Sequence, residues 1–389
     1  MGLNQNTWTL NNWYDQDVAG NVSYSGPGDP GSLWAWGQNN NGDLAQGNTT
    51  DPRSSPVQIG SETNWLVIAC GQTKGGIKTD GTLWSWGYNQ GGQLGQNNRT
   101  SRSSPIQIPG TTWKTVSLSF PSLATKTDGT LWTWGHDING SLGINEEGER
   151  YSSPVQIPGT DWDVVIEGNN HGQGAIKTDG TLWVWGNNHR GQLGQNNLTK
   201  RSSPVQIPGD WKVSSYVSYV SCSYSTTNAI KSDGTLWGWG DNEYGETGDN
   251  SNTIRSSPVQ IGSDTTWKQV NQRGGRGMAV KTDGTLWGWG TNSFGALGLN
   301  DDNKYSSPVQ VGSGTDWDLV VQGNDFSLAT KTDGTLWASG IQEVGQLGNN
   351  VGGTSVCLSS PVQIPGTDWM LANTIYTGSI KTGLVRQQI

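Results

Sequence analysis

Cysteine and histidine are scarce in this chain of 389 residues, which contains three of each. Neither type recurs at a regular spacing, so the sequence predicts no disulfide framework and no zinc-binding or other metal site. We expect the cysteines to be isolated, reduced thiols. The cysteines are Cys70, Cys222 and Cys357, and the histidines are His136, His171 and His189.

Charge and aliphatic residues are also limited. Charged residues make up 14% of the chain and hydrophobic residues 31%, and the formal net charge is −9. Proteins that bind nucleic acids in general, or anionic membranes, need a surface rich in lysine and arginine, and this acidic chain has no such stripe. The first residues, 1–6, have neither a basic region nor an apolar run, so no signal peptide or membrane span is expected. We therefore expect neither nucleic acid nor membrane as a partner.

Glycine and tryptophan, by contrast, are abundant, with 58 and 22 copies. Most of the tryptophans belong to one motif, Leu-Trp-x-Trp-Gly, which returns along the chain. Its first tryptophan is Trp34, Trp84, Trp132, Trp183, Trp237, Trp287 and Trp337, at separations of 50, 48, 51, 54, 50 and 50 residues. A repeat of about fifty residues is typical of a solenoid or a propeller.

Each repeat reads as four short strands. "LWSWG" at 83–87 has strand propensity and is followed by a glycine-rich turn, and "SSPIQIPG" at 103–110 is a short strand with a proline. Two more strands follow, and Asp-Gly marks a hairpin back to the next Leu-Trp. The sequence predicts an all-β fold, a single closed seven-bladed β-propeller of four-stranded blades. The N- and C-terminal strands would close the ring, with the C-terminal segment 367–382 lying beside residues 33–37.

The repeated tryptophans are either a repeated ligand site or the packing between blades. A four-stranded blade cannot bury its own faces, so blades must stack, and a residue present in every blade is best explained by that stacking. The lysine of Lys-Thr-Asp-Gly also recurs. We interpret it as a surface residue beside the turn rather than as one member of a ring of ligands.

These motifs resemble the repeats of the regulator of chromosome condensation (RCC1) family. The likeness covers about residues 30–385 and depends on Leu-Trp-x-Trp-Gly, Gly-x-Leu-Gly and Ser-Pro. It implies a seven-bladed propeller. Members of this family serve mostly as interaction scaffolds, one is an exchange factor for a small GTPase that binds nucleosomes, and a bacterial relative inhibits β-lactamase. Three positions depart from the pattern: Ser339, Thr247 and Ala45.

The first 32 residues do not fit the seven repeats. We expect residues 1–32 to form an N-terminal arm or a segment that caps the seam, and residues 33–389 to form the propeller. Trp13 and Tyr14 are the aromatic residues that the repeat explains least. Two interpretations stay open for them, a docking element and a cap over the closure.

No pattern of catalytic residues is present, so we expect no enzyme, no catalytic residue and no cofactor. The segment before each Lys-Thr-Asp-Gly, however, differs in every repeat, and equivalent turns of a propeller gather on one face. A protein-binding surface is therefore predicted there and on the N-terminal arm. The predicted contact residues are Trp13, Tyr14, Phe120, His171, Tyr224, Arg273, Arg276, Asp325 and Phe326.

Three classes of function remain. The first is a non-enzymatic scaffold that binds one or more proteins through the variable loops. The second is a structural component of a multi-copy assembly, such as a phage or virus particle, anchored by the arm. The third, an exchange factor or an enzyme inhibitor, is the least favoured by the acidic composition. The expected location is the cytoplasm, or the virus particle if the second class holds.

Overall fold

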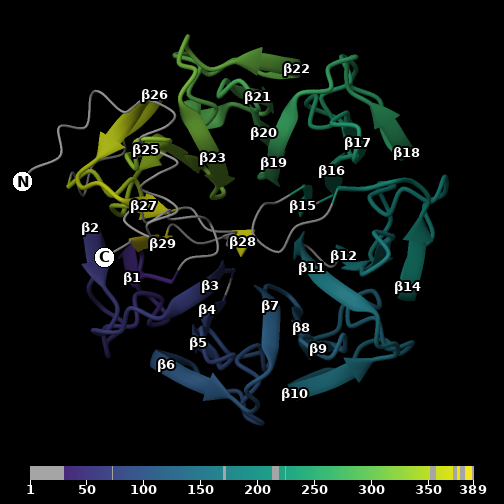
Figure 1. Cartoon of the computed structure of the whole chain (residues 1–389), viewed down its shortest axis with the longest axis vertical. Coiled ribbons are helices and arrows are strands. Elements are labelled where there is room, and N and C mark those ends of the chain that lie inside the picture. The colour runs from purple at the N-terminus through teal and green to yellow at the C-terminus, as the bar shows by residue number, and fades with distance from the viewer. Residues whose placement is uncertain are drawn as a thin grey trace, which may run out of the picture.

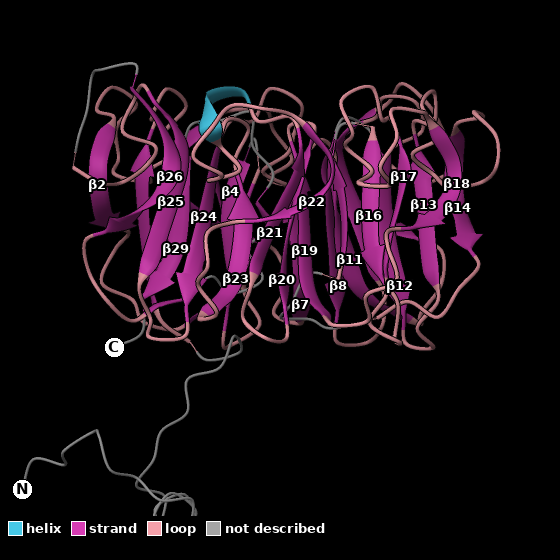
Figure 2. Cartoon of the chain, turned by 90° about the horizontal axis from the view of Figure 1, so that it is seen from above, coloured by secondary structure: helices cyan, strands magenta, loops and turns pink. Residues whose placement is uncertain are grey.

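The computed structural model describes residues 30–71, 73–169, 172–212, 219–223, 225–350, 356–370, 375–376 and 382–387. Within these ranges the chain is built from β-strands, apart from one 3-10 turn, η1 (Ser293–Gly295). Figure 1 looks along the axis around which the sheets are arranged, and Figure 2 shows the strands crossing the thickness of the resulting disc.

The strands fall into four layers between the centre and the rim (Figure 1). The innermost strands are β3 (Trp65–Cys70), β7 (Trp113–Leu118), β11 (Trp162–Asn169), β15 (Val220–Ser223), β19 (Trp267–Arg273) and β23 (Trp317–Gln322). The second strands are β4 (Thr73–Lys78), β8 (Ser122–Lys126), β12 (Gly172–Lys177), β16 (Thr226–Ile230), β20 (Arg276–Lys281) and β24 (Phe326–Lys331).

The third and fourth layers carry the Leu-Trp and Ser-Pro motifs. The third strands are β1 (Ser32–Gly37), β5 (Leu83–Gly87), β9 (Leu131–His136), β13 (Leu182–Gly186), β17 (Leu236–Gly240), β21 (Leu286–Gly290) and β25 (Leu336–Gln342). The outer strands are β2 (Arg53–Gln58), β6 (Arg102–Ile108), β10 (Arg150–Ile157), β14 (Arg201–Ile207), β18 (Arg255–Gln260), β22 (Tyr305–Gln310) and β26 (Val356–Ile364).

The hydrogen-bonded sheets number six among the described residues, not the seven separate blades predicted. The physical reason is a parallel bridge between Glu167 of β11 and Ser221 of β15, which joins two four-stranded units edge to edge. The result is one eight-stranded sheet, in the order β14-β13-β12-β11-β15-β16-β17-β18. The prediction of four strands per repeat is thus confirmed, whereas the predicted count of separate sheets is wrong.

The two ends of the described chain meet in one sheet, in the order β2-β1-β29-β27, where β27 is Trp369–Met370 and β29 is Thr382–Gln387. The described strand beside β1 therefore starts only at the last residue of the predicted segment 367–382, and β27, which lies within that segment, pairs with β29 rather than with β1. No Asp-Gly hairpin links this strand to β1, so the register is not set by a turn. The short strand β28 (Ile375–Tyr376) lies near the centre and pairs in parallel with β3.

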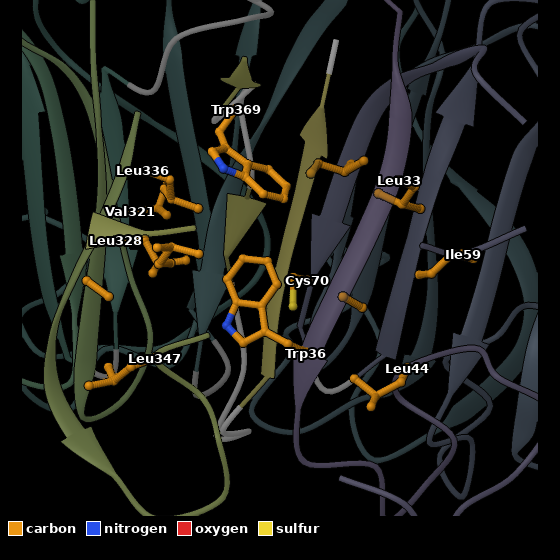
Figure 3. Packing of buried hydrophobic residues seen from close by; sticks show 14 of the residues in the cluster. Leu33, Trp36, Leu44, Ile59, Cys70, Val321, Leu328, Leu336, Leu347 and Trp369 are labelled. Carbon is orange, nitrogen blue, oxygen red and sulfur yellow. The ribbon is translucent and has the colours of Figure 1, made fainter. Parts of the chain in front are cut away.

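The core consists of clusters that join one sheet to the next. In one of them, Trp36 of β1 and Trp369 of β27 pack with Leu328, Leu336 and Leu347 of the preceding repeat (Figure 3). Trp36 is fully buried, and so are the corresponding tryptophans of the other repeats that carry one. The fold is therefore stabilised mainly by large aromatic side chains between sheets, which replace the aliphatic residues that the composition lacks.

Every outer strand contains a proline and a break in register. In β2, for example, Trp34 pairs with Gln58 and Gly37 pairs with Arg53, so the pairing slips around Pro56. The outer strands are the free edges of their sheets. The seven prolines are Pro56, Pro105, Pro154, Pro204, Pro258, Pro308 and Pro361.

Candidate functional site: the loop face

Two sets of connections lie at the same end of the strands and form one face, which we call the loop face. The first set joins the innermost strand to the second strand, and the second set follows Trp-Gly of the third strand. Hydrogen bonds link the two sets directly, as between the Asp241 N–H and the Ser225 carbonyl (2.7 Å) and between the Thr291 hydroxyl and the Gly274 carbonyl (3.0 Å). The face therefore combines the variable turns with the loops of the repeat motif.

The second tryptophan of the motif is used for contacts between repeats. In each repeat that carries it, the indole N–H donates to a backbone carbonyl in the loop of the preceding repeat, at 2.7–3.0 Å. Trp134, for example, donates to the Gln93 carbonyl. Where the sequence has Ser339 instead, the hydroxyl donates to the Ala296 carbonyl at 3.1 Å, so the contact is kept without the ring.

The asparagine that follows Trp-Gly holds the loop in shape. The side-chain carbonyl of Asn89 accepts the Leu94 N–H at 2.8 Å, and its amide donates to the carbonyls of Asn98 and Thr100. Asp137 and Gln342 accept the corresponding leucine N–H in their own repeats. This repeated loop position is thus engaged within the fold.

The repeated lysine is also engaged in the fold, on the opposite end of the strands, which we call the hairpin face. The ammonium group of Lys78 lies 4.0 Å from the Trp84 ring centroid and 5.0 Å from that of Trp65. Lys126, Lys177, Lys231, Lys281 and Lys331 lie over tryptophan pairs in the same way. Such cation–π contacts account for the lysine without any ligand.

The aspartate of the same hairpins accepts two hydrogen bonds from the threonine two residues on. Asp80 accepts from the Thr82 hydroxyl (2.6 Å) and from its N–H (3.0 Å), and the Thr82 oxygen in turn accepts the Trp84 indole N–H. These bonds hold the pKa of Asp80 below its usual value, with the Thr82 hydroxyl as the largest cause. The hairpin motif is therefore a structural element.

The predicted contact residues have different environments. Trp13, Tyr14, His171 and Tyr224 lie outside the described residues. Phe120 and Asp325 are half-buried on the loop face. Arg273, Arg276 and Phe326 are each 1% exposed, so the expectation that they offer surface to a partner is not met.

The two arginines instead hold the turn of the following repeat. Arg276 donates through Nη2 to the carbonyls of Gly323 and Asn324, and Arg273 donates through Nε to the Asn324 side-chain oxygen at 3.1 Å. Burial lowers the pKa of Arg276 to about 10, against a partly opposing effect of Asp325. Their physical role is to fix the turn at 323–325, because a buried guanidinium needs carbonyl partners.

A cleft of about 360 Å³ opens beside this turn on the loop face. Its lining includes Asp241, Tyr244, Glu246, Gly275 and Asp325. Sequence reasoning missed the first three of these, which belong to the loop "GDNEYGETG". The available signal was at Glu246, where the other copies carry an uncharged residue or, in one repeat, Asp43.

Across the described ranges no three histidine, cysteine, aspartate or glutamate side chains are grouped closely enough to hold a metal ion. The helical content of the same ranges is the three-residue turn η1, which is far too short to span a bilayer.

The fold and its motifs define an all-β propeller built from four-stranded repeats. A model of the RCC1-like domain matches residues 77–382, and a model of the regulator of chromosome condensation (RCC1) repeat matches residues 30–73. The chain belongs to the RCC1-like domain family, which confirms the resemblance that the motifs indicate.

Curated relatives match only a segment of this chain. The ultraviolet-B receptor UVR8 of Arabidopsis thaliana is 33% identical over 87 residues, which are 22% of this chain and 19% of the receptor. Human protein RCC2 is 32% identical over 87 residues, 22% of this chain and 16% of RCC2. The matched segments thus span about a fifth of these relatives or less.

Solved structures match over almost the whole chain, at low identity. Prp20p of Saccharomyces cerevisiae, described by its binding to Gsp1p and histones, has a TM-score of 0.76 at 17% identity and covers 93% of this chain and 92% of its own. Human WBSCR16 has a TM-score of 0.76 at 18% identity and covers 93% and 100%. At these identities the likeness establishes the fold alone.

Proposed function

We propose that this protein is a non-enzymatic scaffold that binds another protein through the loop face. The observation that carries the proposal is a difference between repeated and non-repeated residues. The repeated tryptophan, asparagine and lysine side chains are engaged within the fold. Non-repeated residues, among them Asp241, Tyr244 and Asp325, line a cleft on the loop face. A surface that differs from repeat to repeat is suited to one asymmetric partner.

The relatives support a binding role in general terms. Prp20p is described by its binding to Gsp1p and histones, and another structure of yeast RCC1 shows it bound to Kap60. The alternative of a virus-particle component draws no support from these relatives. We therefore favour a scaffold, with Phe120 and Asp325 on its contact surface. Arg273, Arg276 and Phe326 would act there by shaping the turns, because they are buried.

The test compares two variants that add the same charge on opposite faces. Tyr244→Arg with Phe294→Arg alters the loop face, where these rings are 40% and 42% exposed. Ser263→Arg with Ser313→Arg alters exposed residues near the hairpins on the hairpin face. In affinity purification from the organism that carries the gene, with quantitative mass spectrometry, we expect the first variant to lose the partner and the second to retain it. Equal capture by both variants would contradict the proposal.

We also infer that the propeller domain, predicted at residues 33–389, forms a closed ring and that the N-terminal arm, predicted at residues 1–32, lies outside it up to residue 29. Gly31 and Ser32 already belong to the ring, because Gly31 bridges to Trp65 and Ser32 pairs with Gln387. Three contacts support closure between the last and first repeats: the pairing of β29 with β1, the Trp36 indole N–H donated to the Gln346 carbonyl, and the Asn350 N–H donated to the Ser54 carbonyl. Residues 1–29 themselves are outside the described ranges.

Two deletions test this division of the chain. Removing residues 382–389 exposes the edge of β1, so we expect a fall in the melting temperature of several degrees. Removing residues 1–28 should leave the melting temperature unchanged. Differential scanning calorimetry distinguishes the outcomes, and a large loss on the N-terminal deletion would show that the arm is part of the ring.

A further inference from the structure

The cleft on the loop face has the charge and size to take a cationic side chain. We propose that it binds the arginine side chain of a partner segment, with Glu246 and Asp325 as its carboxylate contacts. This inference deepens the proposed function, on which it rests, by naming the chemistry of the partner.

The buried Glu246 is the strongest argument for a cationic occupant. It lines the cleft, is 5% exposed, and accepts the Tyr244 N–H at 2.7 Å through Oε2. Among the described residues no ion pair reaches either Glu246 or Asp325. Burial, the largest cause, raises the pKa of Glu246, as expected for a carboxylate that lacks a counter-charge. A cation entering the cleft would supply that charge.

The cations of the chain itself are already engaged elsewhere. Arg276 donates to the Gly323 and Asn324 carbonyls, and Arg273 donates to the Asn324 side chain. Arg190 pairs with Asp241 at 3.6 Å, and Lys304 lies 3.9 Å above the Tyr244 ring. The last contact also indicates that the surroundings of Tyr244 attract positive charge. The Glu246 carboxylate thus has no cation of the described chain beside it, whereas the Asp325 carboxylate interacts electrostatically with Arg276 without forming an ion pair with it.

Size and the set of available ligands favour an organic cation over a metal ion. The two carboxylates come from separate loops, and among the described residues no group of three histidine, cysteine, aspartate or glutamate side chains could hold a metal ion. The volume of about 360 Å³ lies at the small end of ligand pockets, which are about 300–1,000 Å³. A space of this size suits one long side chain. A guanidinium is preferred to an ammonium because its five N–H donors can serve acceptors on different sides at once.

The test uses the full chain and a short peptide probe. The probe is acetyl-Gly-Leu-Arg-Leu-Gly-amide, and its counterparts carry citrulline or lysine in place of arginine. By isothermal titration calorimetry at 150 mM salt we expect saturable binding of the arginine peptide, weaker binding of the lysine peptide and no binding of the citrulline peptide. Equal binding of the citrulline peptide, or failure of the arginine peptide to bind, would overturn the inference.

Isosteric variants locate the site. Glu246→Gln keeps the shape of the side chain and removes the charge, and we expect it to weaken the arginine peptide about tenfold. Glu62→Gln removes one exposed carboxylate from the hairpin face and should leave the affinity unchanged. Melting temperatures verify that both variants fold. Equal affinities for Glu246→Gln, Asp325→Asn and the unaltered protein would exclude the cleft.

The outcome also separates this inference from the proposed function. If Tyr244→Arg with Phe294→Arg loses the partner while Glu246→Gln leaves peptide and partner binding unchanged, the loop face binds a protein by other chemistry and only the inference fails. If the loop-face variant retains the partner, the proposed function fails first.

Discussion

Lys74→Ala is expected to lower the free energy of unfolding by about 3–5 kcal/mol. The ammonium group of Lys74 lies 2.9 Å from Oδ1 of Asp43 and also donates to the Gly71 carbonyl at 2.8 Å. Both side chains are almost fully buried, at 0% and 1% exposure. Removing the lysine leaves the aspartate charge buried without a partner, which costs far more than the ion pair itself contributes. Urea denaturation of the two proteins measures the difference.

The neighbouring repeat offers the matched control. At the positions equivalent to Asp43 and Lys74 it has Gln93 and Ser122, and the Ser122 hydroxyl donates to the Gln93 carbonyl at 3.2 Å. The double variant Asp43→Gln with Lys74→Ser should therefore recover most of the stability that Lys74→Ala loses. A double variant as unstable as Lys74→Ala would show that the loss comes from packing rather than from the unpaired charge.

Trp134→Ala should also cost about 3–5 kcal/mol, the usual range for truncating a large buried aromatic. Trp134 is completely buried between two repeats, and its indole N–H donates to the Gln93 carbonyl at 2.7 Å. The variant creates a cavity and removes one of the two hydrogen bonds to that carbonyl, which keeps only the longer bond from the Ser122 hydroxyl. Denaturant unfolding monitored by circular dichroism measures the loss.

Trp132→Ala is the comparison for this prediction, because Trp132 belongs to the same motif but is only half-buried. Its N–H donates to the Thr130 hydroxyl within its own hairpin. We expect a clearly smaller loss. Equal losses would mean that burial between repeats does not distinguish the two tryptophans.

Much of the fold follows from the repeat alone. Leu-Trp-x-Trp-Gly and Asp-Gly specify strands and hairpins through local preferences, and these appear where the sequence indicates. The bridge between Glu167 and Ser221 does not follow, because it depends on how closely two innermost strands approach near the centre. The start of β29 is likewise unspecified by a local signal, since no turn ties that strand to β1.

The candidate site was harder to predict than the fold. Position on a variable turn indicates which face a residue occupies, but not whether the next repeat covers it. Arg273 and Arg276 are on the predicted face and are nevertheless buried, because the turn at 323–325 lies over them and offers carbonyl acceptors. Glu246 was missed because it lies in a loop of the repeat motif rather than on a variable turn. The equivalent residue in the other repeats is uncharged, except for Asp43, whose charge is paired with Lys74.

The prolines of the outer strands protect the protein against aggregation through its strand edges. A disc of sheets presents an open strand edge at every repeat along its rim, and each edge could template another chain. A proline in such an edge removes one backbone hydrogen-bond donor. The slipped register around Pro56 also interrupts the regular series of N–H and C=O groups with which a new strand would pair. Rim-to-rim stacking of copies into fibres is therefore discouraged at each of these outer strands.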